Sequence, residues 1–279
     1  MKTYEQAIND HYSRDNLTDS IQSALDRSGH VVSSHEDTAG FDEFHIRGRE
    51  ATRELADLAG LEKGMTVLDL GCGIGGPART LAAEYGCIVT GIDLVAEYCR
   101  AAEMLTAKVG LSERVRFQHG DMTALPFDPE TFDVVWTLHT TMNIENKAAL
   151  FSGVARVLRP GGLLALYEVC SGDVKPPYYP VPWASDGTID FLVPSDVLKR
   201  LISVSGFTEV AWRDVSTASL DWLRRTIDAK KTAAAAGAPR TVGLGVVMGK
   251  TAAQKSGNMV RNLDEDRIRI FQGVFRRAS

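Results

Sequence analysis

An acid and a series of glycines follow one another near residue 70, and their spacing suits the binding of a nucleotide. The apolar run of residues 67–70 contains Asp69, and the glycine-rich stretch 71–76 follows it at once. Glycines let the backbone turn sharply and approach a ligand where a side chain would collide. A helix beginning at the end of this stretch offers unpaired N–H groups to polar ligand atoms. The stretch therefore predicts a nucleotide-type pocket at the carboxyl end of a first parallel strand.

Two kinds of cofactor compete for this loop. Gly71-x-Gly73-x-x-Gly76 matches the fingerprint of dinucleotide-binding proteins. Asp69, however, lies two residues before the first glycine, where its charge would repel a pyrophosphate and attract an ammonium group. The loop resembles motif I of the class I S-adenosylmethionine-dependent methyltransferases, in which it wraps the methionine part of the cofactor. This resemblance implies contacts to S-adenosylmethionine, or to its product S-adenosylhomocysteine, from Asp69, Gly71, Cys72, Gly73 and Gly75.

Further acids follow at the spacing of this family. Residues 87–93 read as a second strand ending in Asp93, whose two carboxylate oxygens could accept hydrogen bonds from both ribose hydroxyls. An NAD-binding protein uses an acid in the same way, so Asp93 alone does not separate the two cofactors. Residues 115–122 read as a third strand, and the resemblance implies that Asp121 holds the adenine amine and Met122 the ring face. Leu94 and Thr137 complete the implied cofactor residues.

The resemblance covers residues 40–170 most fully and continues more weakly toward the C-terminus. Three segments resemble the sarcosine/dimethylglycine N-methyltransferases, a group related to the type 11 and quinone C-methyltransferases: residues 41–48, 180–183 and 262–268. These segments favour an amine nitrogen as the methyl acceptor. Transfer to carbon or oxygen of a quinone precursor, an isoprenoid or another natural product is the alternative.

The catalytic residues are harder to assign than the cofactor residues. Methyl transfer from a sulfonium needs an aligned nucleophile, exclusion of water and, for some acceptors, a base. His139 follows the fourth strand beside the expected methyl site, and its ordinary pKa near neutrality suits proton removal; it could instead only line the pocket. Tyr12 could fold over the cofactor or merely pack a terminal arm. His45 could touch cofactor or substrate, or could cap the helix that follows it.

The acceptor site is expected to lie under the segments that follow the fourth and fifth strands. Five of the ten prolines lie in residues 171–194, which excludes a helix or a central strand and predicts a long loop. Its rings could form a cation–π cage for an amine, flank a flat or apolar acceptor, or make an unselective lid. Glu168 and Arg213 could meet a charged substrate, although salt bridges are their commoner role. The expected substrate-binding residues are Asn143, Tyr178, Tyr179 and Trp183.

The composition limits the other functions. The 279 residues carry a formal net charge of −5, so no overall basic field attracts nucleic acid. The Asn/Asp-Pro-Pro-Tyr/Phe motif of nucleic-acid methyltransferases is missing, and no hydride-transfer constellation supports an NAD-dependent oxidoreductase. A cofactor-binding regulator without catalysis stays an alternative, although the cofactor loop is intact. The sequence is compatible with a homodimer.

The sequence also bears on the compartment. No apolar run is long enough for a membrane span, and the first residues lack the apolar core of a signal peptide. The four cysteines form no C-x-x-C pair, which indicates reduced thiols and neither a disulfide frame nor a zinc site. We therefore expect a cytoplasmic enzyme that acts on a small molecule and holds no metal.

The elements that must position these residues alternate between strands and helices from residue 66 to residue 169. This alternation predicts an α/β, Rossmann-like fold with a mostly parallel sheet between two layers of helices. The resemblance implies seven strands, the last of them antiparallel and inserted between the fifth and the sixth. We expect one methyltransferase domain over residues 1–279, divided into a helical arm (1–45), a cofactor-binding core (46–170), a substrate loop with a helical elaboration (171–266) and the last strand (267–279). Residues 30–40 are expected to be a loop.

Overall fold

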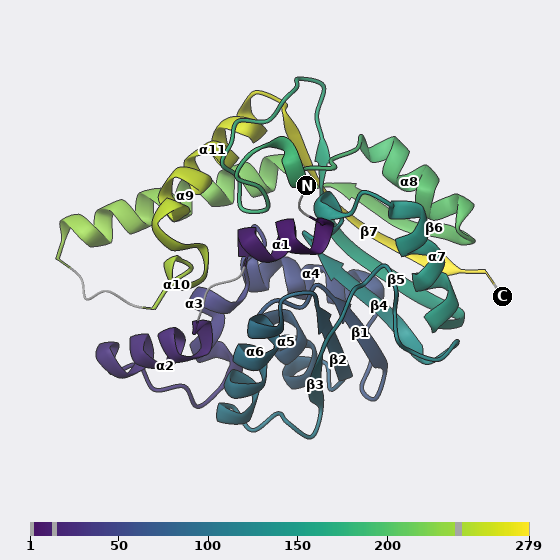
Figure 1. Cartoon of the computed structure of the whole chain (residues 1–279), viewed down its shortest axis with the longest axis horizontal. Coiled ribbons are helices and arrows are strands. Elements are labelled where there is room, and N and C mark those ends of the chain that lie inside the picture. Colours follow the sequence, from purple (N-terminus) through teal and green to yellow (C-terminus); the bar gives the residue numbers. More distant parts are fainter. Residues whose placement is uncertain (1–2, 13–15, 238–241, 279) are drawn as a thin grey trace.

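A seven-stranded sheet forms the centre of the computed structural model, which describes residues 3–12, 16–237 and 242–278. The strands lie in the order β3-β2-β1-β4-β5-β7-β6 (Figure 1). All neighbours pair in parallel except β7, which runs antiparallel to both β5 and β6. The expected fold and the expected place of the last strand are thereby confirmed. The bounds are β1 Thr66–Leu70, β2 Ile88–Asp93, β3 Val115–His119, β4 Phe132–Leu138, β5 Leu158–Ser171, β6 Phe207–Asp214 and β7 Ile268–Arg277.

Helices cover both faces of the sheet because the central strands are apolar on both faces. Neighbouring residues of β1 face opposite layers: Val67 belongs to the core cluster that includes buried residues of α4 and α5, and Leu68 to the one that includes residues of α7 and α8. The α-helices are α1 Tyr4–Tyr12, α2 Leu17–Ser28, α3 Ala39–Asp42, α4 Gly48–Ala59, α5 Gly76–Glu84, α6 Ala96–Lys108, α7 Lys147–Val157, α8 Ser195–Val204, α9 Ser216–Ala235, α10 Gly245–Met248 and α11 Ala252–Asp264.

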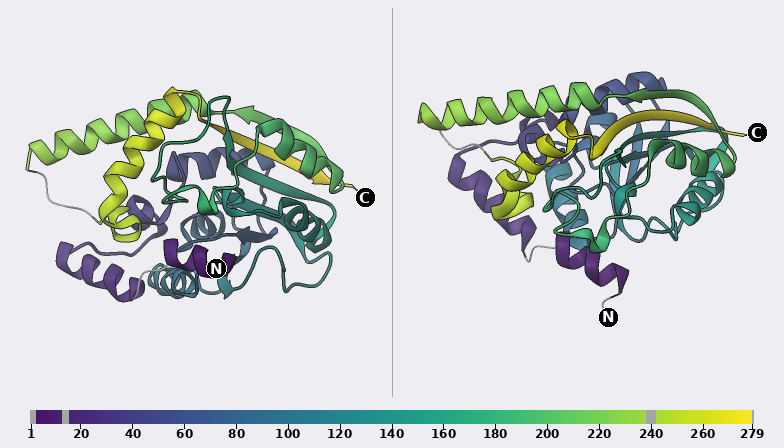
Figure 2. Two further views of the ribbon diagram at one scale, coloured as in Figure 1. Left: turned by 45° about the horizontal axis from the view of Figure 1, so that its top comes forward. Right: turned by 90° about the horizontal axis from the view of Figure 1, so that it is seen from above.

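The carboxyl ends of the parallel strands meet at one edge of the sheet, and segments from both ends of the chain lie over it. Figures 1 and 2 show α1 and the loop after β5 on this side, with α10 and α11 next to them. Helix α2 packs against α6 through Leu17, Ile21 and Leu25, the residues that repeat at four-residue spacing. The outer part of α9 projects beyond the rest of the molecule (Figure 2).

The stretch 30–40 differs from the expected loop. It contains the short 3₁₀ helix η1 (His35–Thr38) and the beginning of α3. Ser34 and Asp37 cap η1 reciprocally, with the Asp37 carboxylate accepting hydrogen bonds from the Ser33 and Ser34 backbone N–H groups. Such a capping box stabilises a single turn that has no periodic apolar pattern, which is why hydrophobic periodicity did not indicate it. The proline-rich loop 172–194 contains only the short 3₁₀ helix η3 (Gly187–Ile189), in line with the prediction.

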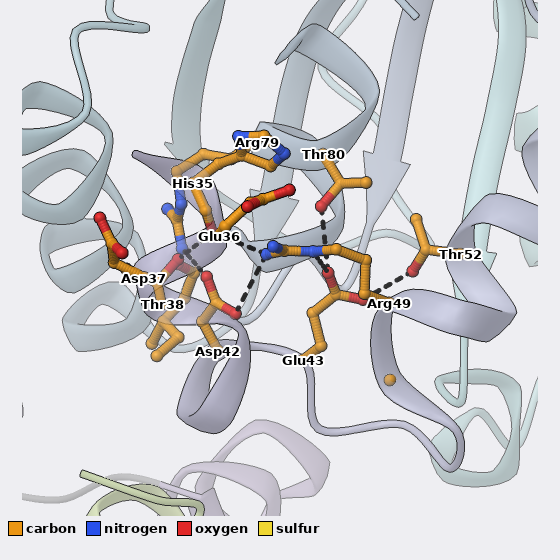
Figure 3. A network of polar contacts seen from close by, with 12 residues as sticks. His35, Glu36, Asp37, Thr38, Asp42, Glu43, Arg49, Thr52, Arg79 and Thr80 are labelled. Atoms are coloured by element: carbon orange, nitrogen blue, oxygen red, sulfur yellow. Dashed lines mark hydrogen bonds and ion pairs between the residues drawn. The ribbon is translucent and has the colours of Figure 1, made fainter. Parts of the chain in front are cut away.

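A buried network of ion pairs joins the segment between α3 and α4 to helix α5 (Figure 3). Arg79 is fully buried, and its Nη2 lies 2.7 Å from Asp42 Oδ2. Arg49 donates to Glu43, at 2.9 Å between Nε and Oε1, and the hydroxyls of Thr52 and Thr80 also donate to the Glu43 carboxylate. The network therefore fixes residues 42–46 against the helix that begins at the end of the glycine loop.

Candidate cofactor and acceptor site

A cavity opens at the carboxyl edge of the sheet, where most of the expected site residues meet. Its walls come from α1, residues 44–46, the glycine loop, the ends of β2, β3 and β4, residues 182–183, and α10 and α11. Of the residues expected from sequence, the cavity is lined by Tyr12, His45, Gly71, Gly73, Asp93, Leu94, Asp121, Met122, His139, Asn143 and Trp183. It is not lined by Asp69, Cys72, Gly75, Thr137, Tyr178 or Tyr179.

The glycine loop adopts a backbone that other residues avoid. The φ angles are +67° at Gly71, +53° at Gly73 and +80° at Gly75. A Cβ atom on Gly71 would collide with Thr140 Cγ2, and one on Gly73 would lie 3.1 Å from the Phe44 ring. Both glycines line the cavity, so the backbone there forms part of the cavity floor. Gly75 instead packs under Phe117, where a Cβ would lie 2.5 Å from Cζ.

Asp93 stands at the end of β2 with both carboxylate oxygens already oriented. Oδ2 accepts a hydrogen bond from the Gly73 N–H at 2.9 Å, and Oδ1 accepts one from the Val95 N–H at 2.9 Å. A carboxylate has acceptor sites for about four hydrogen bonds, so Asp93 keeps acceptor capacity beyond the backbone N–H groups of Gly73, Val95 and Leu94. Burial raises the pKa of Asp93 to about 6, and these backbone N–H groups oppose this rise. The arrangement fits a vicinal diol, such as the two hydroxyls of a ribose.

Replacing Asp93 by Ala is expected to weaken binding of S-adenosylhomocysteine by about 1.5–3 kcal/mol, because two charge-assisted hydrogen bonds are lost. For the natural protein we expect affinity to fall as the pH drops through about 6, since protonation removes an acceptor oxygen. Calorimetric titration over this pH range measures both effects. Asp196→Ala, at an exposed side chain of α8, serves as the control. Unchanged affinity in Asp93→Ala would remove the ribose assignment.

Asp69 and Cys72 lie behind the cavity floor. The Asp69 side chain is buried, its Oδ2 has no hydrogen-bond partner among the described residues, and burial raises its pKa well above the ordinary value. Cys72 is a free, buried thiol. Asp69 is thus not among the residues that line the cavity, where an ammonium group was expected to meet its carboxylate.

The end of β3 presents a second acid. Asp121 lines the cavity, and its Oδ1 accepts hydrogen bonds from the backbone N–H and the hydroxyl of Thr123, at 2.7 and 2.8 Å. Met122 lies next to it, with Cε 3.2 Å from the position of a Cβ on Gly71. An acid and an apolar side chain thus stand side by side near the glycine loop, as the adenine assignment requires.

His139 follows β4, borders the cavity and has a buried Nε2 atom. Its φ is +51°, and its backbone N–H donates to the Tyr167 carbonyl at 2.7 Å. The imidazole stacks on the Tyr167 ring, with centroids 4.8 Å apart and planes 22° apart. Its Nε2 has no hydrogen-bond partner among the described residues. Burial, and secondarily the nearby His45, holds the pKa of His139 well below 6.5, so the ring is neutral near pH 7 and can accept a proton.

His45 lines the cavity but does not cap the helix that follows it, because the N-cap of α4 is Arg47 and no described side chain caps its N–H groups. The His45 ring centroid lies 6.1 Å from that of His139 in an edge-to-face arrangement. Its Nε2 is 2.8 Å from the Gly48 carbonyl at the beginning of α4 and 3.2 Å from Thr52 Oγ1. Burial lowers the pKa of His45. His45 Nε2 therefore has hydrogen-bond partners within the protein, whereas His139 Nε2 has none among the described residues.

Asn143 connects three walls of the cavity. Tyr12 donates its hydroxyl to Asn143 Oδ1 at 2.6 Å. Asn143 Nδ2 donates to the carbonyls of Trp183 and Ile189, at 3.0 and 2.9 Å. Both donor hydrogens of the amide are thus used within the protein, and Tyr12 uses its hydroxyl as well. The structure supports a positioning role for this pair, which ties α1 to the loop after β5.

Tyr178 and Tyr179 lie outside the cavity. The guanidinium groups of Arg261 and Arg267 lie 3.4 and 4.0 Å from the centre of the Tyr178 ring, and both donate to its hydroxyl. Tyr179 donates its hydroxyl to Asp190. The two rings anchor the proline-rich loop, because Tyr178 binds two arginines through its ring face and hydroxyl and Tyr179 binds Asp190 through its hydroxyl. Of the three rings expected to form the acceptor wall, only Trp183 lines the cavity.

Most of the acceptor wall is made of apolar residues that the sequence did not single out. Met248 and Met259 come from α10 and α11, which lie far from the motifs in the sequence. The amphipathic pattern of α11 could have pointed to Met259, but it indicates only that one face of the helix is buried and not that this face lines a cavity. Among the described lining residues the carboxylates are Asp93 and Asp121. The apolar lining side chains include Ile8, Phe44, Ile46, Leu138, Met142, Ile144, Val247, Met248 and Met259.

Comparison with known proteins bears on this geometry. A family profile for a methyltransferase domain matches residues 68–166, which run from β1 to β5 and contain the glycine loop, Asp93 and His139. The chain carries a class I S-adenosylmethionine-dependent methyltransferase domain. S-adenosylmethionine is the cofactor of such domains. The dinucleotide alternative is thereby set aside.

Relatives differ in what they methylate. A sterol 24-C-methyltransferase of Gibberella zeae is 37% identical over 120 residues, which are 43% of this chain and 32% of that protein. Phosphoethanolamine N-methyltransferase 1 of Zea mays is 30% identical over 181 residues, 65% of this chain and 36% of that protein. The matched part of this chain thus corresponds to about a third of these curated relatives.

Solved structures share the whole fold. The crystal structure of the [4+2]-cyclase SpnF has a TM-score of 0.69 and 20% identity, covering 99% of this chain and 97% of the other. This likeness concerns the fold alone. None of the helices in residues 3–12, 16–237 and 242–278 combines the length and apolar character that a membrane span requires. Within the same residues, no group of three or more His, Cys, Asp or Glu side chains is arranged to hold a metal ion.

Proposed function

We propose that this protein transfers a methyl group to a small molecule whose body is largely apolar, with carbon as the acceptor atom. One observation carries the proposal: a neutral imidazole without a hydrogen-bond partner at Nε2 stands beside the cofactor loop, in a cavity whose remaining wall is mostly apolar. A nonpolar wall stabilises an apolar acceptor by excluding water from both surfaces. The sterol methyltransferase among the relatives supports the same class of acceptor.

His139 is the proposed base. The bound cofactor supplies an electrophilic methyl group. When an olefinic or aromatic carbon takes up that methyl group, the acceptor becomes cationic and must lose a proton to reach the product. The imidazole of His139 accepts this proton, since it borders the cavity and burial, by lowering its pKa, keeps the ring unprotonated near pH 7. Asn143 and Tyr12 hold the walls that exclude water from this step.

An amine acceptor, favoured by the sequence, is the second candidate. The phosphoethanolamine methyltransferase among the relatives supports it, as does the ring of Trp183 at the cavity. Two observations weigh against it. Tyr178 and Tyr179 are absent from the wall, so the expected cation cage is reduced to one of its three rings. Moreover, the described carboxylates of the cavity, Asp93 and Asp121, belong to the cofactor half, where they are engaged by backbone N–H groups.

A screen of acceptors by mass spectrometry tests the proposal. The protein is incubated with S-adenosylmethionine and, separately, with prenyl and sterol olefins, quinols, phenols, sarcosine, dimethylglycine and ethanolamine phosphates. The expected result is a product heavier by one CH₂ from an olefin or aromatic acceptor, in equal amount with S-adenosylhomocysteine. A product from the amines alone would move the acceptor atom to nitrogen. Conversion of an olefin without formation of S-adenosylhomocysteine would contradict methyl transfer altogether.

A further inference from the structure

One fully buried carboxylate, Glu168 on β5, gathers the turn that follows β4. The side chain has no exposed surface and does not line the cavity. It accepts hydrogen bonds from the backbone N–H groups of Thr140 and Thr141, each at 3.1 Å from Oε2. The hydroxyls of Thr141 and Thr137 also donate to it, at 2.9 and 3.1 Å. A single charged group thus binds both backbone and side chains of one short turn.

This turn carries the proposed base and touches the cofactor loop. His139 immediately precedes the two residues whose N–H groups Glu168 accepts, and its own N–H is bound by the carbonyl of Tyr167, the residue before Glu168. Thr140 packs its methyl group against Gly71 so closely that a Cβ there would collide with it. The position of the turn therefore decides how the His139 imidazole lies relative to the glycine loop.

We infer that Glu168 is a positioning residue, whose carboxylate fixes the His139 turn against the glycine loop and so sets the distance between base and donor methyl group. The inference rests on the proposed function for its catalytic part. It assigns to Glu168 a role other than the substrate contact that its charge suggested, because the side chain is separated from the cavity by the turn that it binds.

The role depends on the charge of the carboxylate, since the backbone N–H groups and hydroxyls that bind it are all donors. A glutamine at this position would turn its NH₂ group toward one or more of these donors, leaving hydrogen bonds unmade in a buried place. Burial raises the pKa of Glu168 to about 7, against the hydrogen bonds from Thr141, Thr137 and Thr140 that favour the charged form. The charged and titratable groups nearby are Lys147, which donates to the Ile144 and Phe191 carbonyls, and the Cys170 thiol.

Amide hydrogen exchange measures the turn directly and needs no acceptor. In Glu168→Gln, protection of the Thr140 and Thr141 amides is expected to fall by about tenfold or more, because their acceptor is lost. In the natural protein, protection corrected for intrinsic exchange should be lower at about pH 6 than at about pH 8, since the carboxylate is protonated below about 7. This pH dependence should vanish in Glu168→Gln.

Asp133→Asn is the matched control. Asp133 also accepts several hydrogen bonds, from the Thr66 N–H and hydroxyl, but it lies at the opposite end of β4. With an acceptor from the screen, Glu168→Gln is expected to lower kcat by about tenfold or more while the cofactor Kd changes by less than about threefold. Glu168→Asp, which retains the charge, should recover part of kcat.

Two outcomes overturn the inference. Unchanged protection of Thr140 and Thr141 in Glu168→Gln would show that the turn does not depend on the carboxylate. If Asp133→Asn lost as much kcat as Glu168→Gln and the two variants were equally stable, the loss of kcat would be explained by general destabilisation of the fold. If the natural protein forms no methylated product, the proposed function fails, and the exchange experiment still decides whether Glu168 holds the turn.

Discussion

His139→Gln is expected to lower kcat for methyl transfer by about 10²–10³-fold, because a positioned general base commonly contributes that much. The cofactor Kd should change by less than about threefold, since the assigned cofactor contacts come from the glycine loop, Asp93 and Asp121. Stopped assays for S-adenosylhomocysteine and calorimetric titration of the cofactor measure the two quantities. Glutamine retains a polar side chain of similar length but accepts no proton near neutral pH.

The activity of His139→Gln at pH 6.5 and above separates a base from a residue that only lines the cavity. Burial holds the pKa of His139 well below 6.5, so its ring stays unprotonated as the pH rises from 6.5 and contributes no ascending limb there. His30→Gln, in which a histidine outside the cavity is replaced, is the control. Full activity of His139→Gln from pH 6.5 upward would reduce His139 to a lining residue.

Arg79→Met is expected to destabilise the fold by about 3–5 kcal/mol, the range for removing one partner of a buried ion pair. Arg79 is fully buried, and its partner Asp42 would be left with the Arg49 guanidinium, at 4.0 Å, as a poorly compensated charge near Glu43. The free energy of unfolding in urea, extrapolated to water, measures the effect. Because Figure 3 shows this network between α5 and the segment that carries Phe44 and His45, cofactor affinity should fall as well.

Two comparisons test the cause of this loss. Arg53→Met removes the partner of Glu84 in a half-exposed pair and should cost at most about 1 kcal/mol. Adding Asp42→Asn to Arg79→Met removes the poorly compensated charge and should restore part of the stability. A loss in Arg79→Met no larger than that in Arg53→Met would mean that water reaches Asp42.

The sequence by itself predicted the fold and, of the ten expected cofactor residues, six that the structure brings to the cavity. The alternation of apolar strands with helices dictates a parallel sheet, and the carboxyl ends of parallel strands must meet at one edge. Gly71, Gly73, Asp93 and Asp121 lie at or within three residues of three such ends, so their convergence follows from strand order alone. These residues lie within a few positions of an element end, and local spacing is enough to place them.

Only the tertiary structure decided the acceptor half. Its wall comes from α1, α10, α11 and the loop after β5, segments without a fixed relation to the strand ends, and so Met248 and Met259 could not be placed in advance. The same applies to the aromatic residues: Tyr178 turned outward because Arg261 and Arg267 lie over its ring, whereas Trp183 turned inward. The role of Glu168, a charged residue, likewise could not be predicted from the sequence. Whether a carboxylate meets a substrate or binds a neighbouring turn depends on which donors the folded chain brings to it, and hydrogen-bond partners from another strand are set by packing rather than by spacing in the sequence.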